Sequence, residues 1–281
     1  MAHRLNSVCR TLVLPYHFPM EAAGIGRVLF WEGGSLWLAL VTGTMGWHSH
    51  HAIQLCLPIQ GTAQFKTDPA GDWITCEGAV IAPDVPHVFH APGSVVANIL
   101  FEPESAVGRG VLARYGTTGL QLVPAPEAKP LAQPIARAYF DRADDATLIA
   151  LSRQAVARFS GVAMHQDIAD PRVVKAIAEI RQQLDELVTL PALARKVGLS
   201  PGRLRHLFVE ETGISFRRYV LWERLNRALS LGFGGASWTE AAYAANFADS
   251  AHLSRTCQRM FGLAPTRARI EPQNVRHSLS A

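Results

Sequence analysis

The stretch 190–213, LPALARKVGLSPGRLRHLFVEETG, has the spacing of two short helices joined by a tight turn. The first helix is expected to end at Gly198, because glycine adopts a positive φ at little cost. Ser200 can cap the next helix, and Pro201 suits its first position. Gly213 would end that second helix, whose outward face is basic. The stretch therefore predicts a helix-turn-helix with a basic second helix.

The same pattern returns about 48 residues later, in 237–262, SWTEAAYAANFADSAHLSRTCQRMFG. Asn246 takes the place of Gly198, since asparagine is the next most tolerant residue for the left-handed turn. Asp249 can cap the following helix, and Gly262 can end it. One such match is a weak signal, because any two short helices joined at a glycine imitate it. Two matches in register are a much stronger signal, so we expect two helix-turn-helix units.

The segment between the two units, 215–232, is SFRRYVLWERLNRALSLG and holds no internal helix breaker. It should form one helix of about 25 Å, at roughly 1.5 Å per residue. Successive major-groove turns on one face of DNA lie roughly 34 Å apart. A rigid connection of this length would let one chain present two recognition helices to an asymmetric DNA site.

Residues 171–270 resemble the DNA-binding domain of the AraC/XylS family of bacterial transcription regulators. The resemblance covers both units and the connecting helix, including RLRHLF, FRRYVLWERLNRAL and SAHLSRTCQRMFGLAPTRAR. It implies a regulator that binds double-stranded promoter DNA in a sequence-specific way, with RNA polymerase as a partner if the protein is an activator. The family usually has glycine at Asn246 and an aromatic residue at Cys257, so the second unit is expected to pack less tightly.

The same resemblance assigns the DNA contacts to the second helix of each unit. Arg205 and Arg255 are expected to read bases, since a bidentate arginine to guanine is the commonest specific contact. Arg203 and Arg259 are expected on phosphates, which position a protein without reading sequence. For each arginine the alternative is a solvated surface charge. The complete expected DNA-binding set is Gly202, Arg203, Arg205, His206, Ala251, His252, Ser254, Arg255 and Arg259.

Length, composition and charge indicate two domains. The chain has 281 residues, of which 48% are hydrophobic and 18% charged, as in a folded protein large enough for two cores. Residues 1–165 hold 11 Lys and Arg against 12 Asp and Glu, a net −1, whereas 166–281 hold 16 against 11, a net +5. This asymmetry favours nucleic acid as the partner of the second half. We expect residues 1–165 to bind an effector and dimerise, and 166–281 to bind DNA.

The first domain has the pattern of β-structure. Short apolar runs within 25–101, punctuated by Gly, Pro and Asp about every ten residues, predict a sandwich or barrel. The Pro-rich passage 123–134 is expected to interrupt regular structure. Apolar residues three or four apart then predict two short amphipathic helices within 135–159. These helices are expected either to join two subunits of a homodimer or to pack on their own barrel.

A cluster of histidines lies in the stretch GWHSHHAIQ, 46–54, which we expect to be one β-strand. Side chains alternate along a strand, so His48, His50 and Gln54 should share one face. His51 has the other parity and is expected to face outward or to pack at the rim.

These residues resemble the first motif of the cupin barrel, H-x-H followed by an acidic position and then glycine, here Gly61. GAVIAPDVPHVF resembles the second motif and offers His87. Glutamine replaces the usual glutamate at position 54, and Asp84 stands where glycine is common. The resemblance covers roughly 25–101. The expected fold class is therefore α+β, with a cupin-like β-barrel and flanking helices followed by an all-α domain of two helix-turn-helix units joined by a helix.

Three interpretations of the histidines remain open. Three neutral imidazoles and a carbonyl oxygen could hold Zn²⁺, Mn²⁺, Fe²⁺ or Ni²⁺. The same side chains could instead bind a small organic effector by hydrogen bonds, or they could be structural. The expected effector-binding set, which is also the possible metal-ligand set, is His48, His50, Gln54 and His87.

The four cysteines, Cys9, Cys56, Cys76 and Cys257, form no C-x-x-C pair, so we expect reduced thiols and no disulfide framework. No secretory signal or run of 18 apolar residues occurs, and a cytoplasmic protein is expected. The favoured function is a transcription regulator controlled by a small molecule or metal, with no catalytic residue assigned. The alternative is a metal-dependent cupin oxygenase or isomerase that carries a DNA-binding tail, but the glutamine in the metal motif favours regulation.

Overall fold

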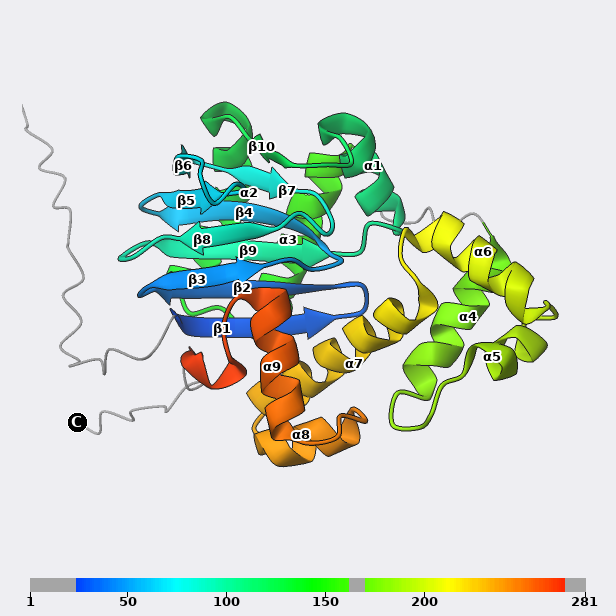
Figure 1. The fold of residues 1–281 in the computed structure, drawn as a ribbon. Coiled ribbons are helices and arrows are strands. Elements are labelled where there is room, and N and C mark those ends of the chain that lie inside the picture. The colour runs from blue at the N-terminus through cyan, green and yellow to red at the C-terminus, as the bar shows by residue number, and fades with distance from the viewer. Residues whose placement is uncertain (1–23, 162–169, 271–281) are drawn as a thin grey trace, which may run out of the picture.

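The structure, a computed structural model, describes residues 24–161 and 170–270, which form a sheet-rich N-terminal part and a helical C-terminal part (Figure 1). This arrangement confirms the expected α+β class. The boundary expected between residues 165 and 166 lies outside the described residues, as does Cys9. Of the remaining thiols, Cys56, Cys76 and Cys257 are all free and buried.

The described strands form two sheets. The larger sheet has seven strands in the order β10-β7-β4-β9-β2-β1-β11, and the smaller has four in the order β3-β8-β5-β6. The strands are β1 (Gly24–Trp31), β2 (Gly34–Val41), β3 (Thr44–His48), β4 (Ile53–Gln60), β5 (Ala63–Lys66), β6 (Ile74–Cys76), β7 (Ala79–Ile81), β8 (His87–His90), β9 (Val95–Phe101), β10 (Leu120–Leu122) and β11 (Ala268–Ile270).

The two sheets pack face to face instead of closing into the expected barrel. Residues from both, such as Val41 of β2 and Phe65 of β5, share one apolar core. The stretch 46–54 is not the single strand that we expected, because β3 ends at His48 and β4 begins only at Ile53. The chain crosses from the smaller sheet to the larger one in that interval.

Three helices pack against the sheet-rich part: α1 (Ala106–Tyr115), α2 (Ala125–Phe140) and α3 (Asp145–Ser160). They share an apolar core with the larger sheet, in which Ile135, Leu148 and Phe159 are buried. The two helices expected within 135–159 therefore pack on their own sheet, and a homodimer through them stays a prediction.

The Pro-rich passage is helical, so its expected irregularity is wrong. Pro126 lies in the first turn of α2, where a backbone N–H would have no helical partner. Pro130 and Pro134 lie further along on the exposed side of the helix. Carbonyl groups on that side that lose an N–H partner can bond to water, which explains why the helix tolerates both prolines.

The C-terminal part consists of helices and a short terminal strand. The helices are α4 (Pro171–Gln182), α5 (Leu190–Lys196), α6 (Pro201–Thr212), α7 (Phe216–Phe233), α8 (Trp238–Ala244), α9 (Ser250–Phe261) and the 3-10 turn η1 (Pro265–Arg267). The pairs α5–α6 and α8–α9 are the two expected units, and α7 is the single helix that connects them.

The sequence determines the turns of both units in the same way. Gly198 and Asn246 have φ values of +71° and +57°, the left-handed conformation that glycine and asparagine tolerate best. Ser200 then caps α6 and Asp249 caps α9, each by accepting a hydrogen bond from the backbone N–H three residues later.

The C-terminal part is docked on the sheets (Figure 1). Strand β11 pairs in parallel with β1 at the edge of the larger sheet. The N–H of Gly46 donates to the carbonyl oxygen of Gly262 at 3.0 Å, at the end of α9. Phe261 stacks on Trp37 with the ring centroids 4.8 Å apart. Contacts between backbone atoms and between aromatic rings therefore hold the second unit against the N-terminal part.

Candidate functional site

The first unit presents a basic helix surface. On α6 the expected DNA-binding residues Gly202, Arg203, Arg205 and His206 are all exposed. The opposite side of α6 packs into an apolar core with α4 and α5, which fixes the direction of the exposed side chains. These four positions are therefore free to meet DNA without unpacking the helix.

The second unit is exposed less evenly. On α9, Ala251, Arg255 and Arg259 are exposed, whereas His252 and Ser254 are half-buried. The contact with the sheets is made at the C-terminal end of this helix, where the carbonyl oxygen of Arg259 accepts from the backbone N–H of residue 49 at 3.4 Å.

The histidine cluster is the candidate effector site. His48 lies at the end of β3, His87 at the start of β8, and His50 in the crossing segment. All three are buried, and one nitrogen of each lies within 4.8 Å of the others. The face-sharing argument for a continuous strand was wrong, yet these residues do meet. The reason is that His48 and His87 are paired across the smaller sheet and the crossing segment returns His50 to them.

The backbone fixes the orientation of each imidazole. Nδ1 of His48 contacts the carbonyl oxygen of Gly46 at 2.7 Å, and Nδ1 of His87 contacts that of Val85 at 2.8 Å. Nδ1 of His50 contacts a third carbonyl at 2.9 Å. A carbonyl only accepts, so each Nδ1 carries the proton and each neutral ring keeps its lone pair on Nε2. Such second-sphere hydrogen bonds are typical of metal-binding histidines.

One of these lone pairs has no partner. Nε2 of His87 is buried without a hydrogen bond, which is unfavourable for a polar atom away from water. Nε2 of His50 faces Oε1 of Gln54 at 3.1 Å, although both are acceptors when the ring is neutral. Gln54 in turn donates to Oδ1 of Asn98 at 2.8 Å. A cation near Nε2 of His50 and Oε1 of Gln54 would satisfy both acceptors. Exchanging the oxygen and nitrogen positions of the Gln54 and Asn98 side-chain amides would satisfy them as well.

Burial keeps the three rings neutral. Desolvation is the largest cause and lowers the pKa of His48 from 6.5 to about 3, with a further lowering by His50. The pKa values of His50 and His87 are lowered as well, again chiefly by burial. Neutral imidazoles are the form that binds a metal ion.

A small cavity adjoins the cluster. Its volume is about 80 Å³, and His48, His50 and Gln54 supply polar atoms to walls that are otherwise mostly apolar. Phe261 and Leu263, from the end of the second helix-turn-helix unit, also line it. The cavity is therefore closed by the same segment that docks α9 on the sheets.

His51 is a functional candidate that the strand parity placed wrongly. It is buried, and its Nε2 lies 2.9 Å from Oε2 of Glu104, which is also buried. The ring packs against Tyr219 and Trp222 of α7. The turn in 49–52 removes the alternation of a strand, so the expected outward position does not apply. No signal in the sequence links His51 to Glu104.

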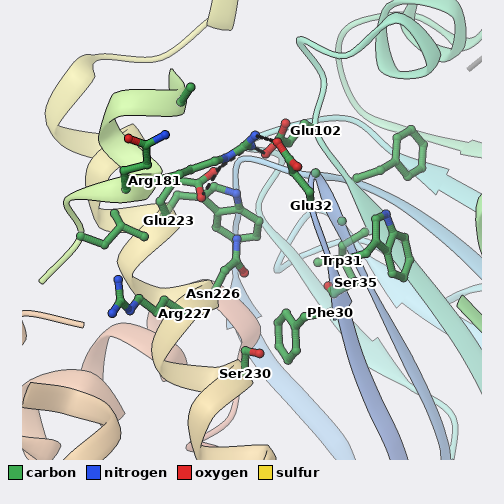
Figure 2. Close-up of a pocket in the computed structure, with 18 residues that line it drawn as sticks. Phe30, Trp31, Glu32, Ser35, Glu102, Arg181, Glu223, Asn226, Arg227 and Ser230 are labelled. Atoms are coloured by element: carbon green, nitrogen blue, oxygen red, sulfur yellow. Dashed lines mark hydrogen bonds and ion pairs between the residues drawn. The ribbon is translucent and has the colours of Figure 1, made fainter. Parts of the chain in front are cut away.

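A second cluster lies between the two parts of the protein (Figure 2). Arg181 reaches from α4 to Glu32 and Glu102 of the sheet-rich part, and it also pairs with Glu223 of α7. Burial and the neighbouring Glu104 raise the pKa of Glu102 well above its usual range, although Arg181 opposes this. A cavity of about 510 Å³ opens beside these side chains.

Comparisons with known proteins agree with the geometry of the C-terminal part. Residues 193–270 match a family described as a helix-turn-helix domain. Over 96 residues the chain is 35% identical to YidL, an uncharacterized HTH-type transcriptional regulator of Escherichia coli (strain K12). That alignment covers 34% of this chain and 32% of YidL, so the likeness spans about a third of the relative.

The whole described fold also resembles solved structures. Apo ToxT from Vibrio cholerae is similar with a TM-score of 0.58 and 11% identity, over 85% of this chain and 97% of that one. ToxT bound to (E)-4-(8-methylnaphthalen-1-yl)but-3-enoic acid has a TM-score of 0.51 and 11% identity, over 83% and 96% of the two chains. At this identity the likeness concerns the fold alone. Among the described residues, no helix combines the length and apolar character needed to cross a bilayer.

Proposed function

We propose that this chain, whose residues 193–270 match a family described as a helix-turn-helix domain, is a DNA-binding transcription regulator of the AraC type that is controlled by an effector in its N-terminal part. The observation that carries the proposal is the repeated unit. Each of the two units has a positive-φ turn and a side-chain cap before its second helix, and the 18-residue α7 joins them. Such a pair suits two turns of the major groove.

The DNA contacts would come from the exposed sides of α6 and α9. We assign base reading to Arg205 and Arg255, because both are exposed and arginine contacts guanine through two hydrogen bonds. Arg203 and Arg259 would bind phosphates. Gly202, His206, Ala251, His252 and Ser254 complete the proposed interface.

The effector that the histidine cluster fits best is a divalent transition-metal ion, namely Zn²⁺, Mn²⁺, Fe²⁺ or Ni²⁺. His48, His50 and His87 each offer a lone pair on Nε2, and Gln54 offers a carbonyl oxygen. The adjoining cavity of about 80 Å³ is small, since sites for drug-sized ligands hold roughly 300 Å³ or more. A bound ion would supply positive charge where acceptor atoms face one another.

A small organic effector is the second candidate for this cluster. ToxT, which has a similar fold, binds an aryl-substituted butenoic acid, and this favours an organic effector for the present chain as well. A metal-dependent oxygenase or isomerase would use the same histidines. We favour regulation because the helix-turn-helix pair is complete.

Binding of an effector to the histidine cluster would change DNA binding through the position of α9. Phe261 and Leu263 line the cavity, so an occupant must interact differently with the docked and undocked positions of this helix. A ligand shifts an equilibrium only by its differential affinity for the two states. We further propose residues 1–165 as the effector domain and 166–281 as the DNA-binding domain, a homodimer as the assembly, and RNA polymerase as a partner of an activator.

DNA binding can be tested by fluorescence anisotropy with a labelled duplex. Affinity should fall by roughly 10³ or more between about 50 and 200 mM salt, if six to ten phosphates are contacted. Arg203→Ala should weaken binding and reduce this salt slope by about one. Arg153→Ala, an exposed arginine on α3, is the matched control and should change neither. A flat salt response in the wild type would refute DNA binding.

The metal proposal has a separate test. Untagged protein purified without chelator should hold close to one ion per chain, and the double variant His48→Ala, His87→Ala should lose it. His90→Ala is the control, because His90 is on the same strand as His87 but bonds to Thr44 instead of the cluster. Absence of metal in the wild type, even after incubation with all four ions, would favour the organic effector.

A further inference from the structure

A second cavity lies outside the histidine cluster, where β1, β2 and β9 meet α4 and α7 (Figure 2). Its volume of about 510 Å³ falls within the roughly 300–1,000 Å³ of small-molecule sites. We propose that this interdomain cavity binds a small organic cation, an amine or guanidine that also carries an apolar group. The carboxyl groups, the aromatic walls and one unpartnered carbonyl oxygen of the cavity each support this class of ligand.

Carboxyl groups outnumber guanidinium groups in the lining of the cavity. Glu32, Glu102 and Glu223 all line it, and all three contact the single guanidinium of Arg181. Figure 2 shows Arg181 between these carboxyl groups, with Glu223 approaching from α7, Glu32 from the turn between β1 and β2, and Glu102 from the position just after β9. One guanidinium group is therefore shared by three carboxyl groups. A second cation would be attracted to the carboxylate oxygens, whereas an organic acid would be repelled.

The second arginine of the lining does not remove this excess. Figure 2 shows the guanidinium of Arg227 turned away from Arg181 and its carboxylates. Glu104, which is buried and paired with His51, is a further carboxyl group that acts electrostatically on Glu102. Burial, and then the neighbouring Glu104, raise the pKa of Glu102 and favour its neutral form, so Glu32 and Glu223 are the carboxylates that a ligand cation would meet.

A buried acceptor in the lining also lacks a donor. Oδ1 of Asn226 has no hydrogen-bond partner, and Figure 2 shows this side chain on α7 near Glu223. A buried carbonyl oxygen without a donor is unfavourable. An ammonium or guanidinium group would supply N–H donors, which a carboxylate ligand does not have.

The remaining walls suit the apolar part of such a ligand. Phe30 and Trp31 come from β1 and Trp222 from α7. Aromatic faces attract cations, most strongly when the pair is shielded from water, and indole is the best of them. Acidic groups beside indole rings therefore favour an organic cation over both a metal ion and a neutral apolar molecule.

A ligand in this cavity would also affect how the two parts of the protein dock, because the cavity lies between them. Glu32 and Glu102 belong to the sheet-rich part, whereas Arg181 and Glu223 belong to the helical part. A ligand that contacts both sides would alter the relative stability of the docked arrangement. That effect on DNA binding rests on the proposed function, but the binding of the cation does not.

Titration calorimetry of the full chain with a matched pair of probes tests the proposal. Tyramine carries an ammonium group, and 3-(4-hydroxyphenyl)propionate has a carboxylate in its place on the same skeleton. Agmatine is a guanidinium probe. We expect tyramine or agmatine to bind with a Kd below about 1 mM, and to quench tryptophan fluorescence, while the propionate binds at least tenfold more weakly.

Two variants and one control assign the binding to this cavity. Glu223→Gln and Glu32→Gln should each weaken binding of the cation several-fold. The Glu32 side chain is 82% exposed, so its variant should fold even if the other does not. Glu179→Gln removes a carboxylate from α4 that pairs with Lys196 outside the cavity, and it should bind the probe like the wild type.

Three results would overturn the proposal. The first is that the propionate binds as tightly as tyramine. The second is that neither cation reaches saturation by about 10 mM. The third is that the Glu32→Gln variant binds the cation as tightly as the wild type does. The titration contains no DNA, so a failure of DNA binding in the salt experiment leaves this result unaffected. Conversely, failure of the cation to bind leaves the helix-turn-helix proposal intact.

Discussion

Gly262, at the end of α9, lies directly against His48: a Cβ atom on Gly262 would come within 2.7 Å of Nδ1 of that histidine. Gly262 also has a φ of +72°, and its carbonyl oxygen accepts a hydrogen bond from the N–H of Gly46. The end of the second recognition helix therefore fits on the histidine cluster only because this position has no side chain. This close approach links the proposed effector site to the DNA-binding part.

We expect Gly262→Ala to destabilise the protein by more than the strain of positive φ alone, about 1 kcal/mol. The added methyl group must also push α9 away from the backbone of Gly46 and the ring of His48. Gly213→Ala is the matched control, because Gly213 has a φ of +76° but no atom within 4 Å of the added Cβ. Chemical denaturation would measure both variants. Equal losses in the two variants would show that the close approach of Gly262 to Gly46 and His48 contributes nothing to stability.

Asn246 combines a strained turn with a tertiary contact. Its φ is +57°, and its side-chain amide donates to the carbonyl oxygen of Glu186 at 2.8 Å. Asn246→Ala should lose about 1–2 kcal/mol, because it keeps the strain and removes the hydrogen bond. Asn246→Gly relieves the strain and should lose less. If urea denaturation shows Asn246→Gly to be less stable than Asn246→Ala, the positive φ of the turn does not explain why asparagine is at this position.

Arg181 holds the two parts of the protein together. Replacing it with alanine would leave Glu102 and Glu223 facing each other without their shared cation, and their side chains are only 13% and 11% exposed. Breaking a buried pair in this way typically costs about 3–5 kcal/mol. Lys196→Ala removes a more exposed pairing on the same domain and should have a much smaller effect. Thermal melts that shift equally in both variants would contradict the role of Arg181.

Cys257 should react slowly with alkylating agents. Burial raises the pKa of its thiol to about 12, so only roughly 10⁻⁴ of it is thiolate at pH 8. Its labelling by iodoacetamide should rise about tenfold per pH unit between about pH 8 and 10, since the thiolate fraction rises by that factor below the pKa. Peptide mapping measures the rate. Labelling at pH 8 as fast as in denatured protein would contradict the burial.

The helix-turn-helix units could be predicted from the sequence because their determinants are local. Gly198, Asn246, Ser200 and Asp249 set the turns and caps within a few residues, and the structure has each in the expected conformation. The Pro-rich helix shows the limit of such rules. Proline disfavours a helix on average, but the exposed side of α2 tolerates it because water replaces the lost partners.

The two candidate effector sites depend on contacts between distant segments. His48 and His50 were recognisable from their spacing, yet their approach to His87 depends on pairing between β3 and β8. The cluster around Arg181 had no signal at all, because Glu102 lies 79 residues away from it in the sequence. Nor does alternation along a strand apply where the chain crosses between sheets, which is why the position of His51 was predicted wrongly.

The most direct test of the central claim is selection of DNA sites from a random double-stranded pool by the wild type and by Arg205→Ala and Arg255→Ala. We expect the wild type to enrich two short motifs whose centres lie about 10 base pairs apart, one helical turn. The first variant should relax the preference in one motif and the second variant in the other. No enrichment by the wild type, or the same complete site enriched by all three proteins, would contradict sequence reading by α6 and α9.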